Sequence, residues 1–180
     1  LYADVLKRSR DPSDAAASIE RIVAAGRRMN RMIADLRDLS RLEARRLDLT
    51  RRRVDLAALV RATVRQVALS APERRMDVRV RGALRDVDAD PDRAAQVVEN
   101  LLTNAMKYGD PSAPIVVDVE GDDAFVTVAV TNSGKGIAAD QLAQLFQRFH
   151  RTDEARGSKI EGTGLGLYIV RELVEAHGGS

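Results

Sequence analysis

The sequence predicts an α+β fold in which a long helix precedes a mixed helix-and-sheet domain. An apolar pattern with alternating steps of three and four residues runs through residues 15–49, at Ile19, Ile22, Gly26, Met29, Ile33, Leu36 and Ser40. Residues 54–180 alternate instead between helical patterns and short β-rich runs. Because 44% of the 180 residues are apolar, the chain can build a packed core, and with three Phe, three Tyr and no Trp that core must be aliphatic.

The N-terminal part is predicted to be helical throughout. Leu1–Arg8 has the pattern of the end of a helix, and Asp11–Asp14 is a turn with helix-start residues. The apolar stripe of residues 15–49 is wide enough for a helical hairpin or a four-helix bundle. The alternative is a long helix packed on its own domain, but the length and isolation of the pattern favour a bundle completed by a second copy.

A polar break at Thr50–Arg53 is the predicted domain boundary, which divides the chain into residues 1–50 and 54–180. After it we expect a helix at 55–69, a strand at 76–81, a helix from Asp90 to Tyr108, strands at 115–120 and 124–131, a loop at 133–162 with a short helix at 140–146, and a helix at 163–176 that ends at His177-Gly178-Gly179. Gly121-Asp122-Asp123 is a hairpin signal. Loops as long as 133–162 are usually functional.

Composition argues against several classes of protein. Without cysteine the chain has no disulfide framework and no thiolate metal site. No apolar run approaches the ~18 residues of a membrane span, and no signal-peptide pattern is present, so we expect no membrane segment in this chain and a cytoplasmic location. The basic excess of residues 1–53 is interleaved with acids on a helical repeat and lacks aromatic partners, which favours a solvated helix face over nucleic-acid binding.

The predicted helix at 92–108 carries two asparagines four residues apart, Asn100 and Asn104, which therefore share one face. Asparagine is a poor interior helix residue, so two on one face call for a reason. Their amide oxygens are hard, neutral ligands suited to Mg²⁺, and Lys107 one turn on could neutralise a phosphate. An exposed polar face with chance asparagines is an equally weighted alternative at this point.

Two glycine-containing segments follow this helix in the sequence. Thr131–Ile137 ends a predicted strand, and its glycines would let the backbone approach a flat base while Asn132 bonds the base edge; alone, a simple turn would be favoured. Gly162–Gly166 runs into an apolar helix, where amides without a neighbouring Cβ can approach an anion and the helix dipole adds positive potential. Neither segment has the Rossmann or Walker spacing.

The only histidines, His150 and His177, have no acidic or thiol cluster at metal-ligand spacing, which disfavours a zinc site. His177 is more simply interpreted as part of a helix end. No Gly-x-Ser-x-Gly elbow and no Ser/His/Asp set is evident either.

Taken in order, the motifs resemble those of the sensor histidine kinases of two-component systems. ENLLTNAMKY resembles their N box, NSGKGI their G1 box, FQRFHR their F box, GTGLGLYIV their G2 box, and HGG the segment that closes the last helix. ADLRDLSRLEARRLDL resembles the second helix of their dimerisation domain. The resemblance implies a two-layer α/β sandwich of the Bergerat ATP-binding type, shared with gyrase and MutL, after a long helix of a dimeric four-helix bundle.

The resemblance also implies the cofactors and the site. ATP and Mg²⁺ would be bound, with Asn104 as the favoured metal ligand and Asn100 beside it. Residues 137–162 would form the ATP lid, anchored by Phe146 and Phe149, with Arg148 or Arg151 near phosphate. The implied nucleotide-binding residues are Asn100, Asn104, Lys107, Tyr108, Asn132, Gly134, Gly136, Ile137, Phe149, Arg151, Gly162, Thr163, Gly164, Leu165, Gly166 and Leu167.

Three departures from the family pattern shape the expected function. The phospho-accepting His would sit just before residue 1, so this chain is not expected to phosphorylate itself at the usual site. Position 132 is Asn where the family usually has Asp, which makes about tenfold weaker ATP binding plausible because a charge-assisted hydrogen bond becomes a neutral one. The family normally adds two closing strands after the Gly-Gly pair, whereas this sequence stops at Ser180. Their absence would leave a sheet edge unpaired.

We therefore expect the catalytic, ATP-binding portion of a histidine kinase, which transfers the γ-phosphate to a His on a helix outside this chain for relay to a response-regulator Asp. The chain would be a split kinase or an excised piece of a longer kinase, whose parent protein can still be membrane-associated. Expected partners are the His-containing helix or a partner kinase chain, paired as a homodimer or heterodimer through residues 1–49, and the response regulator. The alternatives are a degenerate, non-catalytic regulatory module and another ATPase on this sandwich, such as a serine-directed anti-sigma kinase, against which the helical segment argues.

Overall fold

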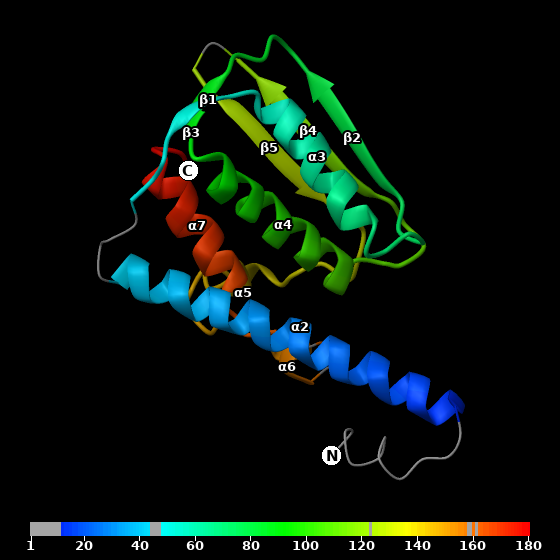
Figure 1. Ribbon diagram of the computed structural model, residues 1–180. Helices are drawn as coiled ribbons and strands as arrows, with labels where there is room; N and C mark the ends of the chain where they lie inside the picture. The colour runs from blue at the N-terminus through cyan, green and yellow to red at the C-terminus, as the bar shows by residue number, and fades with distance from the viewer. Residues whose placement is uncertain (1–11, 44–47, 123, 158–159, 161) are drawn as a thin grey trace. The chain divides into compact units, whose positions relative to one another are not determined.

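The computed structural model describes residues 12–43, 48–122, 124–157, 160 and 162–180 (Figure 1). The chain divides into two compact units, residues 1–45 and 46–180. The predicted helix end at Leu1–Arg8 and residues 44–47 of the predicted long helix lie outside the described residues.

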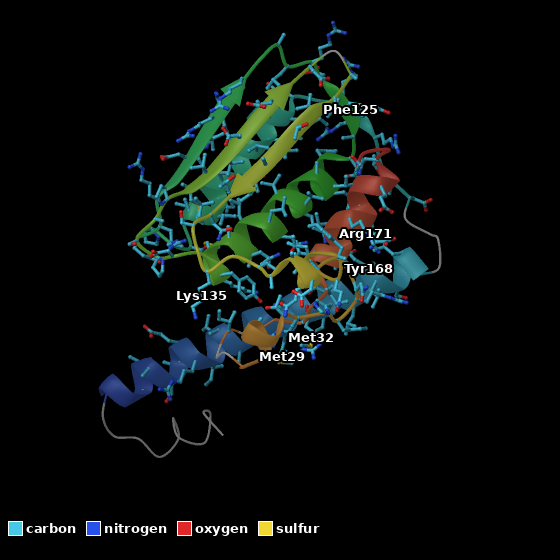
Figure 2. All side chains as sticks on the ribbon, turned by 180° about the vertical axis from the view of Figure 1, so that it is seen from behind. Met29, Met32, Phe125, Lys135, Tyr168 and Arg171 are labelled. Atoms are coloured by element: carbon cyan, nitrogen blue, oxygen red, sulfur yellow. The ribbon has the colours of Figure 1, made fainter. Side chains whose placement is uncertain are left out.

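The first unit contains helix α2, which runs from Pro12 to Glu43. It begins three residues earlier than predicted, at a proline whose fixed φ and missing N–H suit the first turn of a helix. Seven large apolar side chains of α2 are exposed: Ile19, Ile22, Val23, Met29, Met32, Ile33 and Leu36. Figure 2 labels two of them, Met29 and Met32. Within the part of the chain that the structure describes, neither this helix nor any other combines the length and apolarity required to span a membrane.

The second unit is built on a sheet of β2 (Met76–Arg81), β4 (Ile115–Gly121) and β5 (Val126–Thr131). Among the described residues these strands lie in the order β2-β4-β5, with β2 parallel and β5 antiparallel to β4. The register places Val78, Val117 and Val130 side by side across the sheet. Since side chains alternate between the faces of a strand, these valines share one face and the charged residues share the other.

Two helices, α3 (Leu56–Ala68) and α4 (Pro91–Tyr108), pack on the valine face, and a third helix, α7 (Gly166–Ala176), lies beside α4. Helix α4 packs against both α3 and α7, as Figure 1 shows. Between the helices and the sheet lies an aliphatic core of eight buried residues, Val60, Val64, Val98, Leu102, Ala105, Ile115, Val117 and Val119. The predicted two-layer α/β sandwich is confirmed.

Several elements differ from the sequence prediction. The sequence prediction did not include the antiparallel pair β1 (Arg52–Val54) and β3 (Val87–Ala89) or the helix α6 (Asp153–Gly157). Segments of three to five residues are too short to show a helical or strand period. β5 starts two residues late because the carboxylate of Asp122 accepts the N–H groups of Ala124 and Phe125. Helix α5 (Ala139–Leu142) is shorter than the predicted helix at 140–146.

Candidate functional site

Helix α4 forms the floor of the candidate site. Its first turn is capped by the Asp90 carboxylate, which accepts the N–H groups of Asp92 at 3.0 Å and Arg93 at 3.2 Å. While Leu102 and neighbouring apolar residues face the core, Asn100 and Asn104 are half-buried and Tyr108 is exposed. Because these three residues follow one another at steps of four, they form a single polar stripe along the edge of the buried face.

The Asn132 loop packs against the C-terminal end of this stripe. The Asp110 N–H donates to the Ser133 carbonyl at 2.7 Å. A Cβ on Gly134 would lie 2.8 Å from the carbonyl oxygen of Tyr108, and one on Gly109 would lie 3.2 Å from both Cβ and Nδ2 of Asn132. The two segments are therefore in direct backbone contact, which explains why glycines stand at both positions.

The Gly162–Gly166 segment meets the same stripe further along. A Cβ on Gly162 would lie 3.9 Å from the Tyr108 hydroxyl, and one on Gly166 would lie 3.7 Å from Oδ1 of Asn100. Gly164 has a φ of +72°, and a Cβ there would come within 2.7 Å of the Phe149 backbone. Two segments that are far apart in the sequence, the Asn132 loop and Gly162–Gly166, thus converge on one face of α4.

The start of α7 faces this convergence without a side-chain cap. Leu165 occupies the N-cap position and makes no capping hydrogen bond, while the Thr163 hydroxyl accepts the Leu165 N–H at 3.3 Å. The helix begins at Gly166, three residues later than predicted. Since the first N–H groups of a helix have no partner within the helix, this end can bind an anion. Leu165 itself is fully buried, so any contact that it makes with a ligand would go through its backbone.

The segment predicted to be the ATP lid contacts Gly164 through the backbone of Phe149 rather than through a phenylalanine ring. The Phe149 side chain is 59% exposed and Phe146 39% exposed, so neither ring anchors the segment in a core. Phe149 has a φ of 59°, and its backbone is what contacts Gly164. The Arg151 guanidinium donates to the carbonyls of Ala155 and Ile160, so it links residues within this segment instead of pointing to a phosphate site.

Two arginines contact the ring of Tyr168, which follows the Gly162–Gly166 segment on α7. The guanidinium carbons of Arg148 and Arg171 lie 5.8 Å and 5.5 Å from the centre of the Tyr168 ring, within cation–π range. Figure 2 shows Tyr168 and Arg171 on α7 and Lys135 on the Asn132 loop. Lys107, Gly136 and Ile137 of the predicted set are exposed. A positive φ of 76° at Gly136 explains the glycine there.

The Asn100 amide fits the environment that a phosphate and a hard cation would provide. Its Nδ2 is buried and has no hydrogen-bond partner among the described residues. An acceptor such as a phosphate oxygen would satisfy this buried donor, which lies beside the uncapped start of α7. The amide oxygens of Asn100 and Asn104 are ligands of the type that Mg²⁺ accepts alongside phosphates.

A second polar network, which sequence reasoning missed, ties α7 to α4 and to Thr50. His177 Nε2 accepts the Asp90 N–H at 3.0 Å, while its Nδ1 lies 2.6 Å from the Leu173 carbonyl. The Asp90 carboxylate also accepts the Thr50 N–H at 2.9 Å. Burial acts to raise the pKa of Asp90, but the N–H groups of Thr50, Arg93 and Asp92 outweigh it and hold this pKa below its usual value. Only the HGG helix-end signal pointed to His177.

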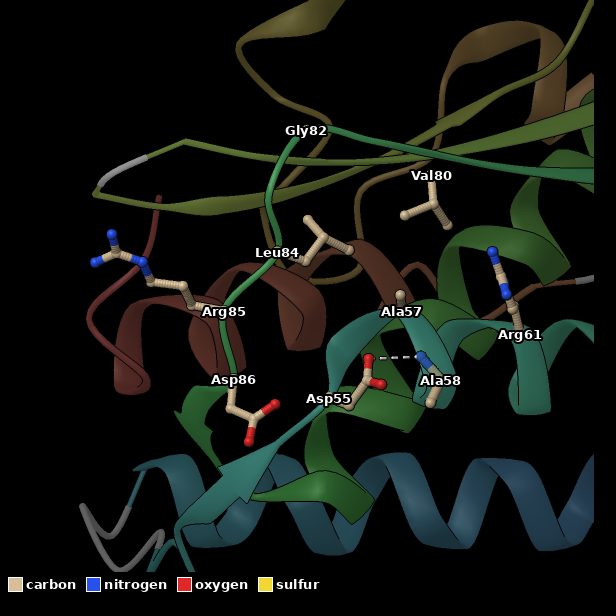
Figure 3. Close-up of a pocket in the computed structure, with 9 residues that line it drawn as sticks. All are labelled: Asp55, Ala57, Ala58, Arg61, Val80, Gly82, Leu84, Arg85 and Asp86. Atoms are coloured by element: carbon tan, nitrogen blue, oxygen red, sulfur yellow. Dashed lines mark hydrogen bonds between the residues drawn. The ribbon is translucent and has the colours of Figure 1, made fainter.

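A separate cavity of about 350 Å³ lies between the start of α3 and the link from β2 to β3 (Figure 3). It is lined by Asp55, Ala57, Ala58, Arg61, Val80, Gly82, Leu84, Arg85 and Asp86. None of these residues belongs to the predicted site. Asp55 caps α3 by accepting the Ala58 N–H, so it already has a structural role.

Comparison with known proteins agrees with this arrangement. Residues 89–180 match the family model described as "Histidine kinase-, DNA gyrase B-, and HSP90-like ATPase", and residues 1–45 match the "His Kinase A (phospho-acceptor) domain". The chain is 34% identical over 154 residues to the sensor protein kinase WalK of Staphylococcus saprophyticus, which covers 84% of this chain and 25% of that protein. It is 29% identical over 171 residues to the sensor protein SrrB of Staphylococcus aureus, covering 94% of this chain and 29% of that protein. The chain therefore spans less than a third of the length of these relatives.

Solved structures of histidine kinases have the same fold. Full-length ShkA in complex with AMPPNP superposes with a TM-score of 0.77 at 26% identity, over 97% of this chain and 36% of that one. The mycobacterial sensor histidine kinase MprB gives a TM-score of 0.62 at 26% identity, over 73% of this chain and 83% of that one. Since the ATPase family model covers more than half of the chain, and its motifs converge on α4, this chain belongs to the histidine kinase-, DNA gyrase B- and HSP90-like ATPase family, and the relatives reported above are sensor histidine kinases.

Proposed function

We propose that this chain is the ATP-binding catalytic portion of a two-component kinase, which transfers the γ-phosphate of ATP to a His on a helix outside these 180 residues. The observation that carries the proposal is the convergence of the Asn132 loop and the Gly162–Gly166 segment on the Asn100–Asn104–Tyr108 stripe. This arrangement provides a place for each part of a nucleotide.

Each part of the proposed site would bind the part of the nucleotide that suits its chemistry. The uncapped start of α7 and the amides of Gly162–Gly166 bind the phosphates, and Asn100 Nδ2 donates to one phosphate oxygen. Asn104 and Asn100 would hold Mg²⁺ through their amide oxygens, and the metal would supply positive charge beside the phosphates. Asn132 bonds the edge of the base, and the Tyr108 hydroxyl lies near Gly162.

Neither histidine of the chain is placed to accept the phosphoryl group. Both ring nitrogens of His177 are within hydrogen-bond distance of backbone groups, and Nε2 of His150, a residue of the proposed lid, is buried. The exposed apolar side chains of α2 support pairing through residues 1–49 with a second copy or with a His-bearing kinase chain. A response-regulator Asp then receives the phosphoryl group.

Calorimetry of the full chain with ATP and Mg²⁺ tests the binding step. We expect a Kd tighter than ~1 mM, a binding free energy of at least ~4 kcal/mol. Asn104→Ala should weaken Mg²⁺-dependent binding about tenfold or more, since a ligand to a charged group is worth ~1.5–3 kcal/mol. Thr103→Ala, one residue away on the same helix but turned by about 100°, is the matched control and should bind like the wild type. No measurable binding by the wild type would refute the proposal.

The transfer step needs a separate experiment. The chain is mixed with a His-bearing helix of the same type of dimerisation domain and with ATP labelled at the γ-phosphate. Acid-labile label on the partner is the expected result, and the Asn104→Ala protein should give none. Tight ATP binding without any label on the partner would instead favour a non-catalytic regulatory module, the alternative that the replacement of the family's Asp by Asn132 supports.

A further inference from the structure

Arg74 is a buried arginine outside every motif discussed so far. It lies in the turn between α3 and β2, and the residue is only 8% exposed. Arginine is almost never this buried unless it is paired. Its Nη1 donates to the carbonyl oxygen of Asp110 at 2.7 Å, whereas Nε and Nη2 are buried and have no hydrogen-bond partner among the described residues.

Asp110 is fastened on three sides just after the end of α4. Arg74 holds its carbonyl, its N–H donates to the Ser133 carbonyl at 2.7 Å, and its carboxylate accepts the N–H and hydroxyl of Ser112 at 2.8 Å and 2.7 Å. The bonds to Arg74 and Ser133 lie on the same backbone segment. Together they connect the α3–β2 turn to the loop that carries Asn132.

The space around Asn132 leaves little room for this segment to shift. Gly109 lies so close to Asn132 that a Cβ on it would be 3.2 Å from the Asn132 side chain, and a Cβ on Gly134 would be 3.7 Å from Asn132 Nδ2. A movement of Gly109 and Asp110 would thus move the wall against which the Asn132 amide rests. The placement of that amide decides how it meets the edge of a base.

We propose that Arg74 is a positioning residue for base recognition: through Asp110 and Ser133 it holds the loop that places the Asn132 amide. This inference rests on the proposed binding of ATP at Asn132. Arg74 itself would not touch the nucleotide. Its role would be to hold the Asp110 backbone in place, which accounts for a buried guanidinium whose described hydrogen bond goes to a backbone carbonyl.

The first experiment needs no nucleotide. Amide hydrogen exchange of Asp110, whose N–H is bonded to Ser133, is compared in the wild type, in Arg74→Met and in Arg75→Met. Arg75 is exposed and pairs with Asp77 at 3.0 Å, so Arg75→Met is a matched control on the neighbouring residue. We expect exchange at Asp110 to rise about tenfold in Arg74→Met only, the effect of losing ~1.4 kcal/mol of local protection. Unchanged exchange, or an equal rise throughout the domain, would overturn the proposal.

The second experiment is a double-mutant cycle of ATP affinity. Arg74→Met is measured in the wild type and in the Asn132→Ala background. If Arg74 acts through Asn132, the Arg74→Met substitution lowers ATP affinity about tenfold in the wild-type background and less than twofold in the Asn132→Ala background. Equal losses in both backgrounds mean that Arg74 supports the fold in general, and they would overturn the inference.

Two further outcomes are covered by the same design. If Arg74→Met does not fold, Arg74→Lys replaces it, because its single ammonium cannot reproduce the guanidinium fork; a smaller rise in Asp110 exchange is then expected, and its absence counts against the proposal. If the wild type does not bind ATP, the proposed function fails, and the exchange at Asp110 still decides whether Arg74 holds the loop.

Discussion

Replacing Asp90 by Ala should destabilise the residue 46–180 unit more than loss of an ordinary helix cap. The Asp90 carboxylate accepts the N–H groups of Asp92 and Arg93 at the start of α4, and it also accepts the Thr50 N–H at 2.9 Å. Loss of a capping Asp costs about 1 kcal/mol. Thr50 itself is exposed, so loss of its part-buried hydrogen bond costs a further ~0.5–1.5 kcal/mol, the net worth of an ordinary hydrogen bond, and we expect a total of about 2 kcal/mol.

Asp55→Ala is the matched comparison because Asp55 caps α3 through a single N–H, that of Ala58 at 2.9 Å. We expect it to cost about 1 kcal/mol. Urea denaturation followed by circular dichroism measures both free energies of unfolding. If Asp90→Ala and Asp55→Ala agree within ~0.5 kcal/mol, the Thr50 bond contributes nothing and the reasoning is refuted.

The effect of Asp90→Ala should also depend on pH. The folded-state pKa of Asp90 lies below its ordinary value because the three N–H groups favour the charged form despite burial. A carboxylate with a depressed folded pKa stabilises the protein at pH values above its unfolded pKa, and the stabilisation is lost as the pH falls through the folded pKa. The difference between wild type and Asp90→Ala should therefore be constant from about pH 5 to 8 and shrink below about pH 4. A difference that grows in acid would contradict this.

Three further predictions concern the site and its support. Asn132→Asp should tighten ATP binding about tenfold by restoring a charge-assisted bond and should also raise the preference for ATP over GTP, because an Asn amide can donate to a guanine carbonyl; calorimetry with both nucleotides checks this, and equal ATP/GTP ratios would contradict it. Gly164→Ala should weaken ATP binding at least tenfold because its φ of +72° and the nearby backbone exclude a Cβ, whereas Gly157→Ala, which has nothing within 4 Å, should bind normally. His177→Ala should cost ~1–3 kcal/mol in urea denaturation because the Asp90 N–H loses its acceptor; a cost under ~0.5 kcal/mol would argue against the bond.

Local spacing explains which parts of the fold were predictable. Helix α4 begins with Asp90 and Pro91 and ends at Tyr108, as its capping residues and apolar period predicted, and β2 has its predicted bounds. Each of these signals lies within one segment. β1 and β3 were missed because three-residue strands form only when Arg52–Val54 meets Val87–Ala89, a pairing that no local pattern encodes.

The candidate site divides in the same way. The residue types and order of the N, G1 and G2 boxes predicted a nucleotide site through their resemblance to a known family, although each motif alone allowed a simpler explanation. Their roles in space were less accessible: the ring of Phe149 is exposed while its backbone contacts Gly164, and Leu165 faces the core. Arg151 donates to lid carbonyls, which only the folding of residues 151–160 could decide.

The sequence by itself determined the family and the longer helices and strands, and it predicted the residues of a nucleotide site, because these depend on periodicity and on motifs within single segments. Only the tertiary structure decided how the motifs meet on α4, that Arg74 reaches the loop of Asn132 through Asp110, and that His177, Asp90 and Thr50 form one network. The Asp110–Ser133 hydrogen bond joins residues 23 positions apart, and the Asp90–His177 hydrogen bond joins residues 87 positions apart. Hydrogen bonds over such separations arise from the packing of whole elements, and no local pattern of residues specifies them.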